Sequence, residues 1–153
     1  MSKTIEFYFD VGSPASYLAW SQLPAIAQRT GATLVYKPML LGGVFMATGN
    51  SSPATVPAKG AYSRIDMQRF ANRYGVTLNQ NPFFPINTLQ LMRAVTAYQG
   101  TPQFEPLLTA IFNAMWISAW TGSKQPRAVD PTDRRHPLRC RWSAAVKTCF
   151  AAN

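Results

Sequence analysis

The sequence predicts an α/β fold in which a βαβ unit is followed by helices. Three observations support this: a nearly continuous apolar run at 4–9, a run rich in strand-forming residues at 33–37, and helical spacing of apolar residues through much of 59–117. A βαβ connection makes its strands parallel, with a right-handed crossover. We therefore divide the 153 residues into a βαβ unit with a following loop, a helical segment and an atypical tail, at 1–58, 59–117 and 118–153.

The first strand leads into a turn and a helix start. The apolar run is typical of a strand buried on both faces, and it stops at Asp10-Val11-Gly12. Ser13 then stands where an N-cap belongs, and Pro14 occupies the first helical position. Such a turn points free N–H groups and the positive end of a helix dipole at whatever lies above Ser13, which suits a phosphate, a carboxylate or a thiolate. The alternative is that Ser13 is only a helix cap.

The helix and the second strand complete the βαβ unit. Helical spacing continues to about Thr30, and Gly31 is expected to end the helix. Pro24 lies inside this pattern and should kink the helix near Trp20, because it removes one backbone donor. After the second strand, apolar residues 40–45 lead into a turn-rich loop that runs to Pro57.

Three helical patterns follow the loop. The first runs from about 59 to 74, with four apolar residues expected to face inward: Tyr62, Ile65, Phe70 and Tyr74. The second runs from Asn87, expected to be a cap, to Gly100. The third has the most regular spacing, with six apolar residues at i, i+3, i+4, i+7, i+8 and i+11: Phe104, Leu107, Leu108, Ile111, Phe112 and Met115. These patterns indicate a hydrophobic core.

Composition narrows the function classes. The net charge is +9, but 121–153 alone contributes +5, so the excess is concentrated in the tail and no nucleic-acid partner is expected. No apolar run is long enough for a membrane span and no signal peptide is apparent, so we expect a cytoplasmic protein without a membrane partner. Cys140 and Cys149 have neither redox nor metal spacing, and with His136 they lack a fourth ligand, so no metal site is expected.

The tail differs from the rest of the chain. Residues 121–142 have no sustained period, three prolines and few aliphatic side chains, so we expect them to be poorly ordered. A short helix at 143–150 is only weakly indicated.

The opening run, residues 7–19, resembles the 2-hydroxychromene-2-carboxylate isomerases and the related kappa-class glutathione transferases, of the thioredoxin-like, DsbA-like group. Further matching motifs follow in order up to residue 117: Pro38, Leu41-Gly42-Gly43-Val44-Phe45, Gly49-Asn50 with Pro53, Lys59-x-x-Tyr62-x-x-x-Asp66-x-x-Arg69, Gly75-Val76, Pro85-x-Asn87-Thr88, Arg93, and Phe112-Asn113-Ala114-x-Trp116. Their order and spacing make the resemblance specific. It implies a thioredoxin-like domain interrupted by a helical insertion.

The resemblance also implies a reaction and a cofactor. In these isomerases, glutathione adds through sulfur to a conjugated double bond of a small aromatic acid, the bond rotates, and the thiol is eliminated. A thiolate is needed near neutral pH, although a free thiol has a pKa of about 8.5. Ser13 is the expected catalytic and glutathione-binding residue, since its hydroxyl can donate to sulfur. The disulfide oxidases of the group carry Cys-x-x-Cys where this chain has Ser13-Pro14-Ala15-Ser16, so thiol exchange is not expected.

The remaining candidates follow from the family pattern. Asn50 and Lys59 would bind glutathione or alternatively the substrate, although Asn50 could instead favour its turn and Lys59 could be a solvated lysine. Lys37, Asn87 and Arg93 would bind the aromatic acid. The alternatives are that Lys37 is simply exposed, that Asn87 is a helix cap and that Arg93 is solvated.

The tail departs from the family pattern. Members continue for further helices, a Gly-Val-Pro segment, two more strands and a Gly-x-Asp turn. Without those strands a two-stranded sheet is small and leaves edges exposed. We expect a truncated or frame-shifted coding sequence near 117–122. Translating the other two reading frames would test this, since one should restore the Gly-Val-Pro and Gly-x-Asp segments.

Three functions therefore compete. The first is a glutathione-dependent isomerase, impaired or intact, with a homodimer as an open possibility. The second is a kappa-like glutathione transferase. The third is an inactive remnant or helical interaction module, which would give no heat in calorimetric titration with glutathione.

Overall fold

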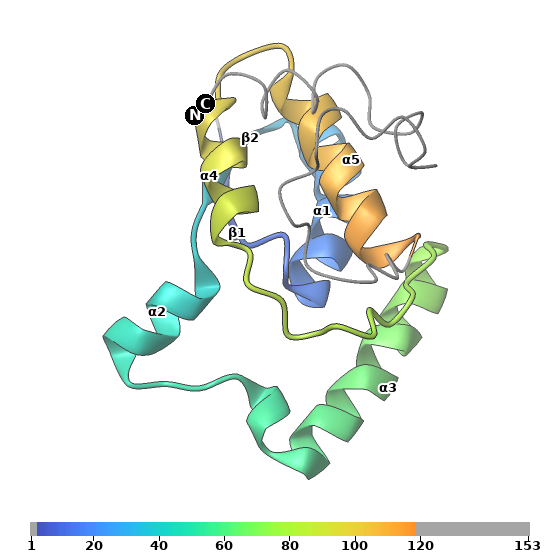
Figure 1. Cartoon of the computed structure of the whole chain (residues 1–153). Helices are drawn as coiled ribbons and strands as arrows, with labels where there is room; N and C mark the ends of the chain where they lie inside the picture. The colour runs from blue at the N-terminus through green and yellow to red at the C-terminus, as the bar shows by residue number, and fades with distance from the viewer. Residues whose placement is uncertain (1–2, 119–153) are drawn as a thin grey trace, which may run out of the picture.

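The computed structural model describes residues 3–118, and the expectations for the tail lie outside these residues. The elements in chain order are β1 (Lys3–Phe9), α1 (Pro14–Thr30), β2 (Ala32–Pro38), α2 (Leu41–Thr48), the 3₁₀ helix η1 (Pro53–Thr55), α3 (Pro57–Tyr74), α4 (Leu89–Ala97) and α5 (Phe104–Trp116) (Figure 1). Within this part of the chain, no helix combines the length and apolar character needed to cross a membrane.

The two strands form the predicted parallel pair. β1 and β2 pair in register from Lys3 opposite Ala32 to Phe9 opposite Pro38, with α1 as the crossover. The expectation that β1 is buried on both faces is wrong, because Phe7 and Phe9 are buried while Tyr8 between them is 56% exposed. Alternate side chains of a strand point to opposite faces, so the core covers one face of this sheet.

Helix α1 begins and ends at the predicted signals. Ser13 is its N-cap, Pro14 its first residue, and Gly31 ends it in the left-handed conformation with φ 63°. The helix continues through Pro24. Local capping rules therefore determine both ends of the crossover helix.

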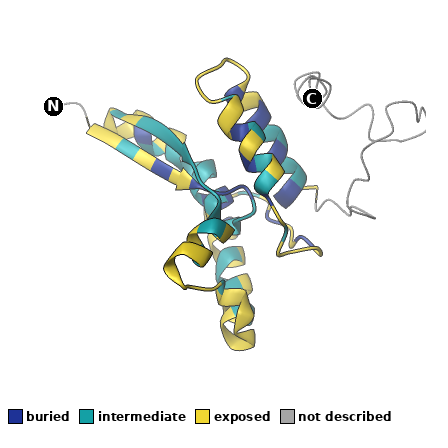
Figure 2. Ribbon diagram, turned by 60° about the vertical axis from the view of Figure 1, so that its left-hand side comes forward, coloured by how far each residue is buried: buried dark blue, intermediate teal, exposed yellow. Residues whose placement is uncertain are grey.

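The core lies between the sheet and α1, α4 and α5. All six residues of the regular pattern in α5 are buried, as predicted. The Phe112 ring packs against Phe9, Tyr17 and Trp20 with ring centroids 6.2, 5.9 and 5.0 Å away. Figure 2 shows buried residues along α5 and at the end of the strands.

The prediction for α3 is correct in position and wrong in orientation. Its four expected inward residues, Tyr62, Ile65, Phe70 and Tyr74, are all exposed, and Ala71 is the buried residue of this helix. Much of α3 projects from the body and is exposed in Figure 2. Apolar spacing identifies a face of a helix, but it does not supply an element for that face to pack against.

Two further boundaries differ from expectation. Residues 41–48, taken to lead into a loop, form α2, which has no buried residue. The second helical pattern begins at Leu89 with Thr88 as N-cap, so the expectation that Asn87 is the cap is wrong. The Asn87 side chain instead accepts a hydrogen bond from the Leu89 N–H at 3.0 Å, which makes a turn ahead of α4.

Candidate functional site

The turn between β1 and α1 presents Ser13 at the N-terminus of a 17-residue helix. The Ser13 N–H donates to the Asp10 carbonyl at 3.0 Å, and the Ser13 Oγ accepts from the Ser16 N–H at 3.2 Å. The cap uses this hydroxyl as an acceptor, and no described residue accepts its proton. Ser13 is half-buried, so part of the residue is in contact with solvent.

A second donor lies beside Ser13. Pro14 has no N–H, and the Ser16 and Tyr17 N–H groups are bound to the Ser13 side chain and carbonyl. The Ala15 N–H has no helical partner in the described residues, and Ala15 is exposed. With no acidic residue in the first turn of α1, this helix start combines two free donors with a positive dipole end. The arrangement favours an anion.

Contacts from α4 and α5 hold this turn in place. The Val11 N–H donates to Sδ of Met92 at 3.4 Å, and the Val11 carbonyl accepts from Nε1 of Trp116 at 2.9 Å. A Cβ added to Gly12 would lie 2.6 Å from the Cγ2 of Thr88. The turn therefore needs glycine at position 12 for close approach.

Asp10 is a buried side chain that the sequence analysis did not select. It is 3% exposed, and its carboxyl accepts hydrogen bonds from the Gly12 N–H, the Leu41 N–H and the Thr88 hydroxyl. In the sequence, the available signal was an acidic residue at the end of a predicted strand, two positions before a glycine. Sequence alone could not supply two of its three partners, which lie 31 and 78 residues away.

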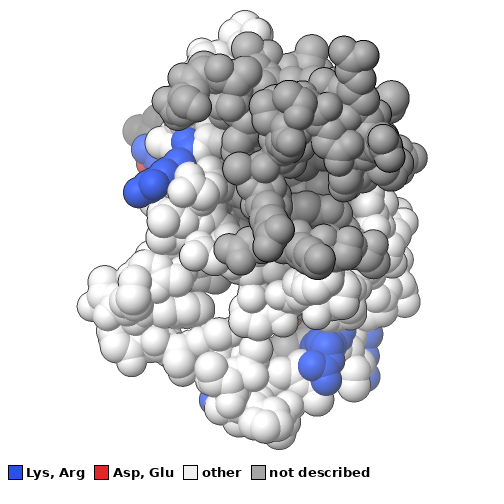
Figure 3. All heavy atoms as spheres, in the orientation of Figure 1, with Lys and Arg blue, Asp and Glu red and all other residues white. Residues whose placement is uncertain are grey.

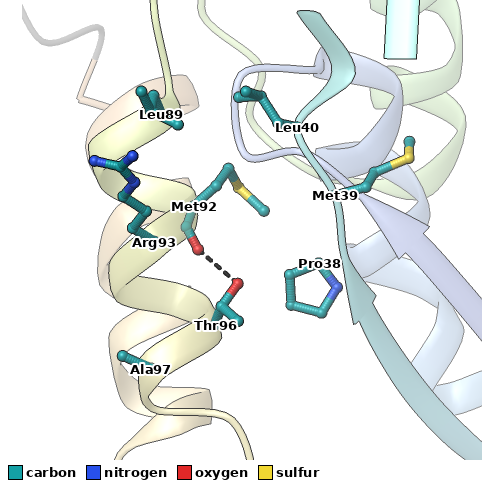
Figure 4. A pocket seen from close by; sticks show the side chains of 8 residues that line it. All are labelled: Pro38, Met39, Leu40, Leu89, Met92, Arg93, Thr96 and Ala97. Atoms are coloured by element: carbon teal, nitrogen blue, oxygen red, sulfur yellow. Dashed lines mark hydrogen bonds between the residues drawn. The ribbon is translucent and has the colours of Figure 1, made fainter. Parts of the chain in front are cut away.

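Arg93 lies at a mostly apolar hollow between the end of β2 and α4, which we call the β2–α4 hollow. Its volume is about 390 Å³, and it is lined by Pro38, Met39, Leu40, Leu89, Met92, Arg93, Thr96 and Ala97. Figure 4 shows Leu40 and Leu89 on opposite walls, while the Arg93 guanidinium extends along α4 away from Pro38. An aromatic ring matches this lining, with a cation available at the rim.

Asn50 and Lys59 come together at a second hollow, which we call the 45–59 hollow. It has a volume of about 330 Å³ and is lined by Phe45, Asn50, Ser51, Ser52, Pro53, Thr55, Val56 and Lys59. The Asn50 Oδ1 accepts from the Ser51 N–H at 2.8 Å, which leaves its amide N–H groups as donors. Lys59 lies in the first turn of α3 and forms no ion pair within residues 3–118.

Lys37 and Asn87 lie elsewhere. The Lys37 Nζ is 3.6 Å from a carboxylate oxygen of Glu6, on the face of the sheet that carries exposed Tyr8. Asn87 is exposed in the segment before α4. Of the six candidates, the structure brings Asn50 and Lys59 to one hollow and Arg93 to another. Ser13 lines neither of these two hollows.

Basic side chains of the described residues do not form one continuous surface on the face in Figure 3. One group lies over α3, which carries four cations: Lys59, Arg64, Arg69 and Arg73.

Two tyrosines near the turn have raised pKa values. Burial raises the pKa of Tyr17 above 10.0, and burial together with the nearby charge of Glu105 raises the pKa of Tyr36. The Tyr17 hydroxyl donates to the Thr77 carbonyl at 2.8 Å and so connects α1 to the segment after α3. Both phenols are neutral near pH 7, so they act as packing and hydrogen-bonding groups.

The comparison with known domain families identifies the fold. The family described as DSBA-like thioredoxin domain matches residues 4–129. The chain belongs to this family. The match confirms the thioredoxin-like fold expected from the resemblance, here with two parallel strands and five α-helices within residues 3–118, and it extends past residue 117.

Individual relatives of this DsbA-like chain carry two names. A 2-hydroxychromene-2-carboxylate isomerase of Sphingobium xenophagum is 36% identical, with 76% of this chain and 60% of that protein covered. Glutathione S-transferase kappa 1 of Caenorhabditis elegans is 32% identical, with 79% and 55% covered. A solved 2-hydroxychromene-2-carboxylate isomerase structure matches with a TM-score of 0.66 and 31% identity, over 76% of this chain and 57% of that one. The chain thus spans little more than half the length of these relatives.

Proposed function

We propose that the chain carries the thiol-activating part of a glutathione-dependent isomerase of the 2-hydroxychromene-2-carboxylate type, with a small aromatic acid as substrate. The observation that supports this most is the Ser13 turn. It offers an unused hydroxyl proton and the free Ala15 N–H at the N-terminus of α1. Relatives that bear this name, at 34–36% identity, support the same reaction class.

The residues present fit a thiolate. A sulfur anion at the start of α1 would accept from the Ser13 hydroxyl and the Ala15 N–H, while the helix dipole favours its negative charge. The carboxyl of Asp10 is a nearby negative group, but three donors surround it and it is buried away from solvent. The two donors and the helix dipole at Ser13 therefore outweigh the charge of Asp10, and the position favours an anion.

The other candidates have proposed roles in binding. When bound, glutathione would supply the nucleophilic sulfur that adds to the substrate and later leaves it. Asn50 and Lys59, at the 45–59 hollow, would donate to a carboxylate of the tripeptide. Arg93 would attract the acid group of the substrate and the β2–α4 hollow would take its ring. Lys37 and Asn87 stay as proposed substrate contacts, although Lys37 already pairs with Glu6.

The test uses four variants in the first turn of α1. Ser13→Ala removes both cap and donor, Ser13→Gly keeps a residue that is well tolerated at an N-cap but has no side-chain donor, and Ser13→Thr keeps both. Ser16→Ala is the matched control, because the Ser16 side chain has no hydrogen bond within the described residues. We expect Ser13→Ala and Ser13→Gly to lower kcat/KM about 100-fold, as loss of an active-site donor does, while the other two retain activity.

The readout that separates the donor from the cap is the pKa of bound glutathione, followed by ultraviolet thiolate absorbance. It should lie below the free value of about 8.5 in the wild type and return toward it in Ser13→Ala and Ser13→Gly. Equal pKa values in Ser13→Gly and Ser13→Thr would reject the role of the hydroxyl. Folded wild-type chain without turnover or glutathione binding would reject the function and favour an inactive remnant.

A kappa-like glutathione transferase is the second candidate, because the C. elegans relative of that name matches over a similar part of the chain. The same Ser13 turn would serve both reactions, so the products distinguish them. An isomerised acid with glutathione recovered supports the isomerase, and a stable glutathione adduct supports the transferase. A cytoplasmic location and a homodimer are further parts of the proposal, to be tested by cell fractionation and by sedimentation.

A further inference from the structure

The carboxyl of Asp10 is a buried group without a role in the function proposed above. It is 3% exposed, and its three partners all donate: Gly12 N–H to Oδ1 at 2.9 Å, Leu41 N–H to Oδ2 at 2.9 Å, and the Thr88 hydroxyl to Oδ2 at 3.0 Å. Burying a carboxylate is costly unless hydrogen bonds satisfy it. Here the donors come from three separate segments of the chain.

The two carboxyl oxygens connect different parts of the site. Oδ1 holds the turn at Gly12, directly before Ser13, and the Ser13 N–H also donates to the Asp10 carbonyl. Oδ2 holds the starts of α2 and α4 through Leu41 and Thr88. The residues next to these two donors, Leu40 and Leu89, form opposite walls of the β2–α4 hollow (Figure 4). One side chain therefore connects the Ser13 turn to both walls.

The N-cap side chains of these two helices make no hydrogen bond to their own helix starts. The N-cap position of α2 is Leu40, whose side chain cannot accept a hydrogen bond, so the Leu41 N–H is satisfied by Asp10. The N-cap of α4 is Thr88, whose hydroxyl donates to Asp10 and makes no capping bond to its own helix. At α2 a tertiary contact thus replaces the usual local cap, and at α4 the contact of Thr88 with Asp10 adds to the local bond from the Leu89 N–H to Asn87.

We propose that Asp10 is a positioning residue that fixes the Ser13 turn relative to the two walls of the β2–α4 hollow. The inference rests on the proposed function, which assigns the Ser13 turn to the thiol and the β2–α4 hollow to the aromatic acid. Asp10 itself touches neither. It acts by keeping the two subsites in one arrangement, which the addition step requires.

The experiment compares Thr88→Val, Thr88→Ser and Asp10→Asn. Thr88→Val keeps the shape and removes one link to Oδ2, Thr88→Ser restores the hydroxyl, and Asp10→Asn replaces an acceptor with a donor facing Leu41 and Thr88. The readouts are separate KM values for glutathione and for 2-hydroxychromene-2-carboxylate, the pKa of bound glutathione, and amide hydrogen exchange at Gly12 and Leu41.

The expected result is a split between the two substrates. Thr88→Val should raise KM for the aromatic acid about tenfold, leave the thiol pKa and KM for glutathione unchanged, and be rescued by Thr88→Ser. Asp10→Asn should raise both KM values and accelerate exchange at Gly12 and Leu41 together. Equal behaviour of Thr88→Val and Thr88→Ser, or faster exchange at one of the two amides alone, would overturn the inference.

Failure of the proposed function would be visible separately. If the wild-type chain neither binds glutathione nor isomerises the acid, the function is rejected. Hydrogen exchange at Gly12 and Leu41 still tests whether Asp10 connects the Ser13 turn to the walls of the hollow. Joint acceleration at Gly12 and Leu41 in Asp10→Asn would then support Asp10 as the connection between turn and walls, and independent behaviour would reject it.

Discussion

The part of the molecule built from β1, α1, β2, α4 and α5 surrounds a core, whereas the segment from α2 to the start of α3 is mostly exposed. The contrast is clearest between two helices: α5 has 13 residues and seven buried side chains, and α3 has 18 residues and one. Both are regular helices at positions that the sequence predicted. Regular local structure therefore does not imply a buried face.

The candidate site is divided in the same way. Ser13 lies in the packed part, where Asp10, Val11 and Trp116 tie its turn to distant segments. Asn50 and Lys59 lie in the exposed part, where the Asn50 side chain bonds to the next residue along the chain. Changes around Ser13 should thus affect stability and chemistry together, while changes at Lys59 should affect binding alone.

The largest effect is expected in the aromatic core. Phe112→Ala removes a fully buried ring that packs against Phe9, Tyr17 and Trp20, so it should lower the free energy of unfolding by about 3–5 kcal/mol. Tyr62→Ala on α3, where the side chain is 62% exposed, is the matched control and should change it by less than about 0.5 kcal/mol. Urea unfolding measures both, and comparable losses would contradict the division into a packed and an exposed part.

A smaller effect is expected from crowding at the turn. Gly12→Ala brings a Cβ to 2.6 Å from the Cγ2 of Thr88, whose hydroxyl is held by Asp10, and should cost about 1–3 kcal/mol. Thr88→Ser removes that methyl group and should recover most of the loss in the double variant. A double-mutant cycle measures the coupling, and additive effects would show that this contact does not limit the turn.

The third prediction concerns alkaline pH. Because folding raises the pKa of Tyr17 above 10.0, the neutral phenol contributes stability that is fully present below about pH 10 and is lost as pH rises through the raised pKa. Tyr17→Phe should cost about 1 kcal/mol at pH 7 through loss of the bond to Thr77, and should make the alkaline decline less steep. Urea unfolding from pH 7 to 11 tests this, and parallel curves for the two proteins would refute it.

The smallest effect on stability is expected at Lys59. Lys59→Gln should leave the free energy of unfolding within about 0.5 kcal/mol, because the side chain is exposed and forms no ion pair in residues 3–118. KM for glutathione should rise about fivefold, and the effect should shrink at high salt, where charge attraction is screened. Arg64→Gln on the same helix is the control, since Arg64 does not line the 45–59 hollow. Equal KM changes in the two variants would argue against a specific site at Lys59.

Most local elements of this protein could be predicted from the sequence, with α2 as an exception. Apolar runs located both strands, Ser13 and Gly31 marked the ends of α1, and the spacing in α5 predicted its buried face. The short motifs also identified the DsbA-like family. These features depend on residues within a few positions of one another, so they can be predicted from local patterns in the sequence.

Which faces of the helices are buried, and which groups the site residues contact, could be seen only in the folded structure. The apolar face of α3 has the right spacing but lies away from the core, and the Asp10 carboxyl is bound by Leu41 and Thr88, which are distant in the sequence. The register of the two strands brings Lys37 next to Glu6, and the residues around Lys37 in the sequence do not indicate this contact. Burial and long-range hydrogen bonds depend on which segments meet, and segments meet only when the chain is folded.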